Sequence, residues 1–382
     1  MIYLNNCLTS KPDDEVLAAM MPYLTDKFYL PFIFVSSGEQ ISTDIESFKE
    51  TIAKPIGAQS KEIHFTSGGT SANNLAIKGF LTANSNRGNH IICSVIDYPD
   101  ILSNAAFFED AGFEVSYIEP DENGFISASN VEKEIREDTI LFMGTLVNHT
   151  VGTTLPMVQL KPLFKKRGIK VFVDGCEAFG RVAVDVEKMG IDMMSISAHK
   201  IHGTKGVGAL YKRSGILLNQ IKHGVARVDN LETGAVSIAA ISGFAKATEL
   251  AFQNNNMSHI RNLRNYLYGQ IVKKIPNTLL NSSLGEDGSP HHLNISFDYI
   301  EGEAIMMMLS LKGILLATGS ACSSADLSMN YVLKAMGRTH VQSHGSVKFT
   351  LSRKNTKAEI DHVVKNLKDV VEELRRRSPL GK

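Results

Sequence analysis

The sequence has no excess of charge of either sign. Its 40 Lys and Arg residues balance 40 Asp and Glu residues, so the formal net charge is +0 at pH 7. Long-range attraction to nucleic acid or to an anionic membrane is therefore not built into the whole chain. The clearest local basic patch is the final "LRRRSPLGK", which we interpret as the solvated end of a helix. We expect neither direct nucleic-acid binding nor a membrane partner.

Cysteine is scarce as well. The chain has four cysteines without any paired spacing such as CxxC, namely Cys7, Cys93, Cys176 and Cys322. This pattern gives no sign of a cysteine metal site and fits free thiols in a reducing compartment. The N-terminal "MIYLNNCLTSKPDD" lacks the charged and apolar regions of a signal peptide, and no apolar run reaches the ~20 residues that span a bilayer. We therefore expect a cytoplasmic protein.

What the chain does have is length and a repeated strand–helix pattern. A chain of 382 residues is longer than a domain with a single hydrophobic core usually is, so a large domain plus a smaller one is expected. The strand-like runs in the middle are "HIICSVI", "EVSYIEP", "TILFMGTLV", "KVFVDG" and "MMSISAH". Helix-like "DILSNAAFFEDAG" and "MVQLKPLFKKRG" separate some of them, which predicts an α/β domain with a largely parallel sheet.

The ends of these strands carry the first candidate site residues. Tyr98, Asn148, Asp174 and Lys200 each follow a strand-like run closely. Ligands of parallel sheets bind at the carboxyl ends of the strands, so we predict that these side chains converge on one site. From about residue 256 a long amphipathic helix, a polar loop and mixed elements follow, and they predict a smaller α+β domain.

Asp174 and Lys200 together suit pyridoxal phosphate. A lysine amine can hold the cofactor aldehyde as a Schiff base, and a buried carboxylate keeps the pyridine nitrogen protonated. Taken alone, a buried Asp and a Lys more often form a simple ion pair. The loop "TSGGTSANN" adds Gly69 and Thr70 before a helix-like run, where backbone N–H groups could bind the cofactor phosphate. A plain helix N-cap is the alternative reading of that loop.

Three further residues complete the candidate site. Ser197 and His199, just ahead of Lys200, could donate hydrogen bonds to the phosphate. Cys322 lies in "ATGSACSS" among small and polar residues, outside any apolar periodicity, so we expect it to be accessible. It also precedes a candidate helix, whose N-terminal field favours a thiolate. A nucleophilic thiol beside this cofactor suits removal of sulfur from a bound cysteine.

These motifs resemble one enzyme family. The stretches "FTSGGTSANNLAIKG", "VNHTVGTTLP", "VDGCEAFG", "SISAHKIHGTKGVGALY", "NISF", "ATGSACSS", "YVLKAMG" and "FTLSR" occur in the order and spacing of cysteine desulfurases of the NifS/IscS type. Those are fold type I pyridoxal phosphate enzymes of the class V aminotransferase group. The resemblance covers nearly the whole chain. It implies a large domain with a mainly parallel seven-stranded-type sheet at 11–255, and a small domain from 1–10 and 256–382 with a mobile cysteine loop.

The resemblance also assigns roles. It implies that Lys200 binds the cofactor and shuttles protons, and that Cys322 accepts the sulfur of L-cysteine as a persulfide while alanine leaves. The implied cofactor contacts are Asp174, Gly69, Thr70, Tyr98, His149, Glu177, Ser197 and His199, and the implied substrate contacts are Arg353 and Asn148. No metal is implied. A homodimer and a sulfur-acceptor protein are the implied partners.

The sequence departs from the family pattern at four places. Tyr98 stands where the family has a histidine on the cofactor ring, and His149 and Glu177 replace an Asn and a Gln near the cofactor phenolate oxygen. We hypothesise that His149 compensates for the added carboxylate as a hydrogen-bond donor. Ala235 replaces a threonine that reaches the phosphate of the partner subunit.

The departures leave the pathway open. The sequence ends at "SPLGK", short of the tail with which the housekeeping enzymes engage an iron–sulfur scaffold, so we expect a specialised acceptor. Iron–sulfur assembly, tRNA thiolation and DNA phosphorothioation all remain open. The alternatives are a related lyase, such as selenocysteine lyase, and a weakly active sulfur-carrying partner protein.

Overall fold

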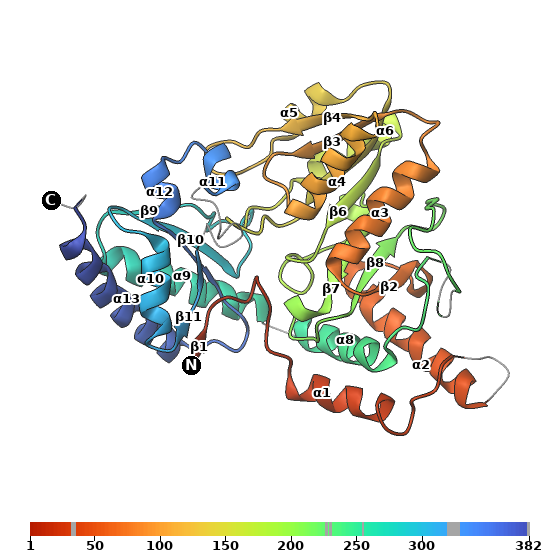
Figure 1. Ribbon diagram of the computed structural model, residues 1–382, viewed down its shortest axis with the longest axis horizontal. Coiled ribbons are helices and arrows are strands. Elements are labelled where there is room, and N and C mark those ends of the chain that lie inside the picture. The colour runs from red at the N-terminus through yellow and green to blue at the C-terminus, as the bar shows by residue number, and fades with distance from the viewer. Residues whose placement is uncertain (32–35, 226–227, 229–230, 254–255, 319–328, 380–382) are drawn as a thin grey trace.

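The computed structural model describes residues 1–31, 36–225, 228, 231–253, 256–318 and 329–379. Figure 1 shows two lobes, one around a large twisted sheet and one around a smaller sheet. The chain begins and ends in the smaller lobe, where the N-terminal strand β1 (Ile2–Tyr3) pairs in parallel with β11 (Ile314–Leu315). No helix in the described ranges is long and apolar enough to cross a bilayer.

The large sheet has seven strands in the order β2-β8-β7-β6-β5-β3-β4. β4, β3, β5, β6 and β7 run parallel, and β8 is antiparallel to both of its neighbours. The strand bounds are β2 Ile63–Thr66, β3 His90–Ser94, β4 Glu114–Ile118, β5 Thr139–Thr145, β6 Lys170–Asp174, β7 Met193–Ser197 and β8 Gly208–Lys212. The predicted α/β class and largely parallel sheet are confirmed, and every strand-like run named above forms a strand.

Both faces of this sheet are covered, which explains its continuous apolar runs. On β5, Leu141 and Met143 pack into the cluster beneath α3 and α4, whereas Phe142 packs into the cluster on the opposite face. The helices of this lobe are α1 Asp14–Met20, α2 Ser36–Ala53, α3 Gly69–Ala83, α4 Pro99–Asp110, α5 Ala128–Glu134, α6 Met157–Arg167, α7 Val186–Met189 and α8 Ile238–Ala251.

The smaller lobe has its own apolar core, which draws on β1, β10, β13, α9, α10 and α13. Its main sheet has the order β12-β13-β10-β9 and is antiparallel. The remaining bounds are β9 Thr278–Leu280, β10 His292–Phe297, β12 Ala317–Thr318, β13 Ser346–Thr350, α9 Asn256–Lys274, α10 Gly302–Ser310, α11 Tyr331–Ala335, α12 His340–His344 and α13 Lys357–Arg377. The division at 11–255 stays a prediction, although the separate core is what it would require.

Helix α13 shows how the local sequence sets an element. Thr356 and Glu359 form a capping box, in which each side chain accepts a hydrogen bond from the other's backbone N–H. Three arginines occupy the last turn, where the helix dipole favours cations. The basic patch is therefore a helix end as predicted, and Arg375 also donates to the carbonyls of Pro276 and Asn277.

Candidate active site

A cavity of about 430 Å³ lies where β5, β6 and β7 end. This is the edge of a parallel sheet at which ligands bind. The structure brings most of the predicted residues to it: Gly69, Thr70, Tyr98, Asp174, Glu177, Ser197, His199 and Lys200. The sequence did not single out Asn73, Asp100 and Thr145, which also line the cavity, or assign Cys176 to it.

Asp174 is a buried carboxylate at the end of β6. Its Oδ1 accepts a hydrogen bond of 2.9 Å from the Cys176 backbone N–H, and its Oδ2 accepts one of 2.8 Å from Asn73. It forms no ion pair within the described ranges, and burial raises the pKa of the Asp174 carboxyl. A positively charged group in the cavity would stabilise the anion.

Asn73 is a site residue that sequence reasoning missed. Its Nδ2 donates to Asp174 and also, at 3.2 Å, to Asp100. Its Oδ1 is buried without a hydrogen-bond partner among the described residues. The signal was its spacing, because a residue four positions after Gly69 lies on the same face of a helix.

The opposite end of the cavity suits an anion. Gly68 is the N-cap of α3 and makes no side-chain cap, so Gly69 and Thr70 open the first turn with backbone N–H groups near the cavity. The Ser197 Oγ is buried and has no hydrogen-bond partner in the described part of the chain. His199 Nδ1 lies 3.1 Å from Thr9 Oγ1, and burial lowers the pKa of His199 to about 4.

Lys200 stands between this cavity and the N-terminal segment. Its Nζ donates to the Cys7 carbonyl and, at 2.7 Å, to Glu177 Oε1. Burial lowers the pKa of Lys200, but the Glu177 carboxylate together with Cys7 and Tyr98 outweighs burial, and the pKa is raised overall. The Lys200 side chain is therefore held as an ammonium ion as long as its nitrogen is not bonded to another group in the cavity.

Glu177 is the centre of a buried charge network. Its Oε2 accepts from Arg181 and lies 3.3 Å from His291 Nε2 and 3.7 Å from His292 Nε2. Burial alone would raise the pKa of Glu177, yet Lys200 and Arg181 hold it well below its usual range. Among the described residues the hydrogen-bond partners of Glu177 are therefore Lys200, Arg181 and His291, and His149, which the sequence suggested as a partner, is not one of them.

Glu177, His291 and His292 lie close enough together to raise the question of a metal ion. Two cations, Lys200 and Arg181, already compensate the single carboxylate. A further divalent cation would be repelled by both of them at short range. We therefore assign no metal to this cluster.

Tyr98 and His149 lie together beside the cavity. Their rings meet edge to face with centroids 5.1 Å apart, and only Tyr98 lines the cavity itself. Burial raises the pKa of Tyr98 to about 12, so the phenol stays neutral near pH 7. Burial also lowers the pKa of His149 to about 3, and its Nε2 lies 3.1 Å from Tyr331 Oη. Neither ring carries charge at neutral pH.

Asn148 holds a turn rather than facing the cavity. Its Oδ1 accepts from the backbone N–H groups of Thr150 and Val151, and its Nδ2 donates to the Ile96 carbonyl at 2.9 Å. These bonds fix the connection after β5 and so support Tyr98 indirectly. The predicted substrate contact of Asn148 stays a prediction.

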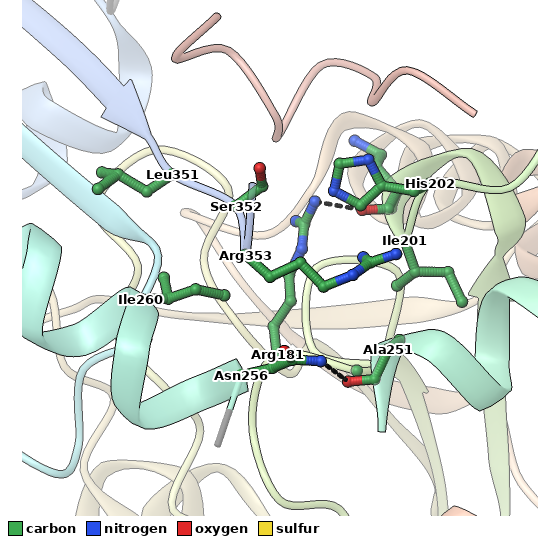
Figure 2. Close-up of a pocket in the computed structure, with 11 residues that line it drawn as sticks. Arg181, Ile201, His202, Ala251, Asn256, Ile260, Leu351, Ser352 and Arg353 are labelled. Carbon is green, nitrogen blue, oxygen red and sulfur yellow. Dashed lines mark hydrogen bonds between the residues drawn. The ribbon is translucent and has the colours of Figure 1, made fainter. Parts of the chain in front are cut away.

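Arg353 lines a second cavity of about 340 Å³, which shares Lys200 with the first. Figure 2 shows Arg181, His202 and Arg353 around this space, with Arg353 reaching in from the segment after β13. Asp13 is the counter-ion: its carboxylate pairs with both Arg353 and Lys354. Asp13 was not predicted, because it lies 340 positions from Arg353 in the sequence.

Cys322 lies outside the described residues. Ala235 is described and exposed, and it has no side-chain hydroxyl with which to reach a phosphate.

The fold and the two adjoining cavities define a class of protein, the fold type I pyridoxal phosphate enzymes. The family model described as aminotransferase class-V matches residues 2–363. The chain is 38% identical over 380 residues to the cysteine desulfurase IscS of Dictyoglomus turgidum, covering 99% of this chain and 96% of that relative. The chain belongs to the class V aminotransferases and, within them, to the cysteine desulfurases of the IscS type. The family and the activity predicted from the sequence are confirmed.

Solved structures agree with this assignment. A NifS-like protein superposes with a TM-score of 0.91 at 29% identity, covering 98% of this chain and all of that one (100%). SspA in complex with cysteine superposes with a TM-score of 0.82 at 28% identity, covering 93% of this chain and 100% of that one. Members of these families depend on pyridoxal phosphate.

Proposed function

We propose that this cysteine desulfurase binds pyridoxal phosphate in the 430 Å³ cavity and removes sulfur from L-cysteine. The observation that carries the proposal is the meeting of Lys200, Asp174 and the start of α3 in one cavity. Within the described residues Asp174 has no ion pair, which suits a protonated ring nitrogen, and the Ser197 hydroxyl beside a helix N-terminus has no hydrogen-bond partner, which suits a phosphate. The residues present therefore fit the cofactor.

The chain's own groups divide the work. When bound, the cofactor supplies an electron sink that lets an amino-acid α-carbon give up a proton. Lys200 Nζ would hold the cofactor and, once released, would accept and return the proton at the substrate α-carbon. Asp174 would keep the ring nitrogen protonated, and Asn73 would keep Asp174 oriented. Tyr98 would cover one face of the ring as an uncharged aromatic side chain.

Arg353 would bind the substrate carboxylate in the second cavity. Its guanidinium matches a carboxylate in charge and in fork geometry. Asp13 now occupies part of that fork, so substrate binding would shift Asp13 toward Lys354, its other partner. Because Lys200 lines both cavities, a substrate whose carboxylate binds Arg353 would have its α-carbon near the lysine amine.

Cys322 would take the sulfur. Its thiolate would attack the sulfur of the bound substrate, forming an S–S bond while the C–S bond breaks. The carbon takes up a proton and leaves as alanine, and Cys322 keeps the sulfur as a persulfide. A sulfur-acceptor protein would then receive the outer sulfur atom. Since this thiol must stay reduced, and Cys7, Cys93 and Cys176 are free cysteines, we propose a reducing compartment such as the cytoplasm.

A homodimer is the proposed assembly. Apolar side chains are exposed along the N-terminal segment and around α1: Leu8, Leu17, Met21, Leu24, Phe28 and Tyr29. A surface region with six exposed apolar side chains suits contact with a second copy of the chain. Light scattering would check this, because a mass of one chain would contradict it.

The direct test uses mass spectrometry of the intact protein. The purified, cofactor-loaded protein is incubated with L-cysteine beside Cys322→Ser and Cys93→Ser, while alanine is measured. We expect one added sulfur on Cys322 and alanine release, with both lost in Cys322→Ser and retained in Cys93→Ser, whose thiol is buried in β3. Cofactor binding with neither product would contradict the proposal.

A further inference from the structure

The Glu177 carboxylate is divided between two sets of partners. Its Oε1 faces Lys200 Nζ at 2.7 Å, whereas its Oε2 faces away toward Arg181 and, at 3.3 Å, toward His291 Nε2. Arg181 and His291 are buried side chains, and the Lys200 side chain is only 11% exposed. Donors at Oε2 withdraw negative charge from the oxygen that contacts the lysine.

His291 is fixed from the smaller lobe. Its Nδ1 lies 2.6 Å from Ser289 Oγ, in the loop just before β10. The Ser289 backbone is tied on both sides, since its N–H donates to Gly152 at 2.8 Å and its carbonyl accepts from Arg264 at 3.0 Å. His291 is fully buried (0% exposed), so its ring has no freedom to turn toward water.

The chemistry of its neighbours selects the tautomer of His291. Burial lowers the pKa of His291 well below its usual range, so the ring is neutral and carries one N–H. Glu177 is an anion that can only accept, while the Ser289 hydroxyl can donate to Nδ1. Nε2–H toward Glu177 therefore gives a charge-assisted hydrogen bond. Arg181 Nη1, 3.1 Å from the same nitrogen, then donates to the carboxylate instead.

We propose that His291, oriented by Ser289, is a positioning residue that draws the negative charge of Glu177 away from Lys200. The inference rests on the proposed function, in which Lys200 binds the cofactor. This role follows from the position of the Glu177 carboxylate. If its full negative charge lay on the oxygen beside Lys200, it would hold a proton on the lysine nitrogen too tightly for proton transfer. The Ser289–His291 pair moderates that hold without adding a net charge.

Other groups around Glu177 define the background of this effect. Arg181 contributes a fixed positive charge, and His292 lies 3.7 Å from Oε2 with its pKa lowered by burial to about 4. The nearby titratable groups Tyr98, His149 and His199 are also uncharged near neutral pH, because burial shifts their pKa values away from it. The Cys7 thiol also lies beside Lys200 and acts on its charge. The visible absorption band of the cofactor reports the titration of the lysine nitrogen to which the cofactor is bound.

The test is a pH titration of the visible absorption band of the lysine-bound cofactor in the full-length protein. Glu177→Gln removes the anion and should lower the midpoint by about 1 to 3 pH units. His291→Asn keeps a contact for Ser289 but withdraws the donor from Oε2, so the midpoint should rise by about half a unit. His291→Gln returns an N–H near the position of Nε2 and should restore the midpoint.

The double variant and a control decide the mechanism. If His291 acts through Glu177, adding His291→Asn to Glu177→Gln should cause no further shift. His90→Asn is a matched control, because His90 is equally buried with both ring nitrogens hydrogen-bonded, at the other end of the sheet. An unchanged midpoint in His291→Asn, a shift that persists in the double variant, or failure of His291→Gln to rescue would each overturn the inference.

Failure of the proposed function gives a different result. Borohydride reduction followed by peptide mass spectrometry should place the cofactor on Lys200 in the unmodified protein. A protein that carries no cofactor on Lys200 would overturn the function itself. Trapping on Lys200 with an unmoved midpoint in His291→Asn would overturn only the role of His291.

Discussion

Asp174 illustrates at the scale of one residue how a site can weaken the fold that carries it. The carboxylate is buried, hydrogen-bonded by two N–H groups and without an ion pair in the described chain. Its folded-state pKa is raised above the unfolded value, so its ionisation opposes folding as the pH rises through the folded pKa. The cofactor-free protein thus loses stability toward neutral pH at this residue.

The first prediction follows from this sign. Asp174→Asn should leave the cofactor-free protein as stable at pH 7 or more stable by about 1 kcal/mol. Asn73 Oδ1, which has no hydrogen-bond partner among the described residues, can turn toward the new amide. The substitution should also remove most of the rise in Tm that pyridoxal phosphate gives the unmodified protein. Thermal unfolding with and without cofactor measures both effects.

Asp192→Asn serves as the control, since Asp192 pairs with Arg213 outside the cavity. That variant should keep the full cofactor-induced rise in Tm. A rise of the same size in Asp174→Asn would contradict the assigned role of Asp174.

Arg353 carries the second prediction. Arg353→Lys retains the charge but loses the fork, so the KM for L-cysteine should rise about tenfold while kcat changes little. Steady-state kinetics of alanine formation measures both constants. Lys354→Ala is the matched control, because Lys354 also forms an ion pair with Asp13 but is half exposed. The KM of this variant should stay within about twofold of the unmodified enzyme. Equal KM values for Arg353→Lys and the unmodified enzyme would contradict a carboxylate contact.

At the scale of elements, the start of α3 depends on close packing against the loop after β6. A Cβ placed on Gly69 would lie 2.5 Å from Cys176 Sγ, closer than real atoms approach. Its next neighbour, Ser197 Cβ, is at an ordinary 3.6 Å. Of the nearest atoms in the described part of the chain, the Cys176 sulfur is therefore the one that prevents a side chain at this position.

The third prediction uses this single clash. Gly69→Ala should displace the first turn of α3 and weaken pyridoxal phosphate binding by about tenfold or more. The double variant Gly69→Ala/Cys176→Ala removes the sulfur and should recover most of the affinity, while Cys176→Ala alone stays near the unmodified value. Equilibrium dialysis against the cofactor measures the four affinities. Additive losses would show that Gly69 matters for another reason.

Elements are also where the sequence predicted most. Buried parallel strands announce themselves as continuous apolar runs, and a polar residue at the end of such a run faces the ligand edge of the sheet. That rule identifies Asp174, Tyr98 and Lys200 from the sequence. It does not identify His291 and Asp13, which come to the site from the smaller lobe and from the N-terminal segment. No local periodicity encodes contacts made 114 or 340 positions apart.

At the scale of the whole molecule, the loop before β10 joins the two lobes at the active site. Thr154 N donates to the Asp287 carbonyl at 3.0 Å, and Ser289 N donates to Gly152 at 2.8 Å. Arg264 on α9 holds the loop from the other side, through hydrogen bonds of 3.0 Å to each of three backbone carbonyls: Ser283, Leu284 and Ser289. One buried arginine of the smaller lobe thus supports the ring that contacts Glu177.

The last prediction tests this long-range support. Arg264→Met fills a similar volume but leaves three carbonyls without their donor, so the free energy of unfolding should fall by about 2 to 5 kcal/mol. The absorption midpoint of the lysine-bound cofactor should also rise, as in His291→Asn, because Ser289 loses its anchor. Urea unfolding and the pH titration measure the two effects on one preparation. Arg261→Met, on the same helix but partly exposed, removes a single hydrogen bond to the Gly285 carbonyl of this loop and an ion pair with the exposed Glu286, so both of its effects should be smaller. A stable Arg264→Met protein with an unmoved midpoint would show that Arg264 does not hold this loop.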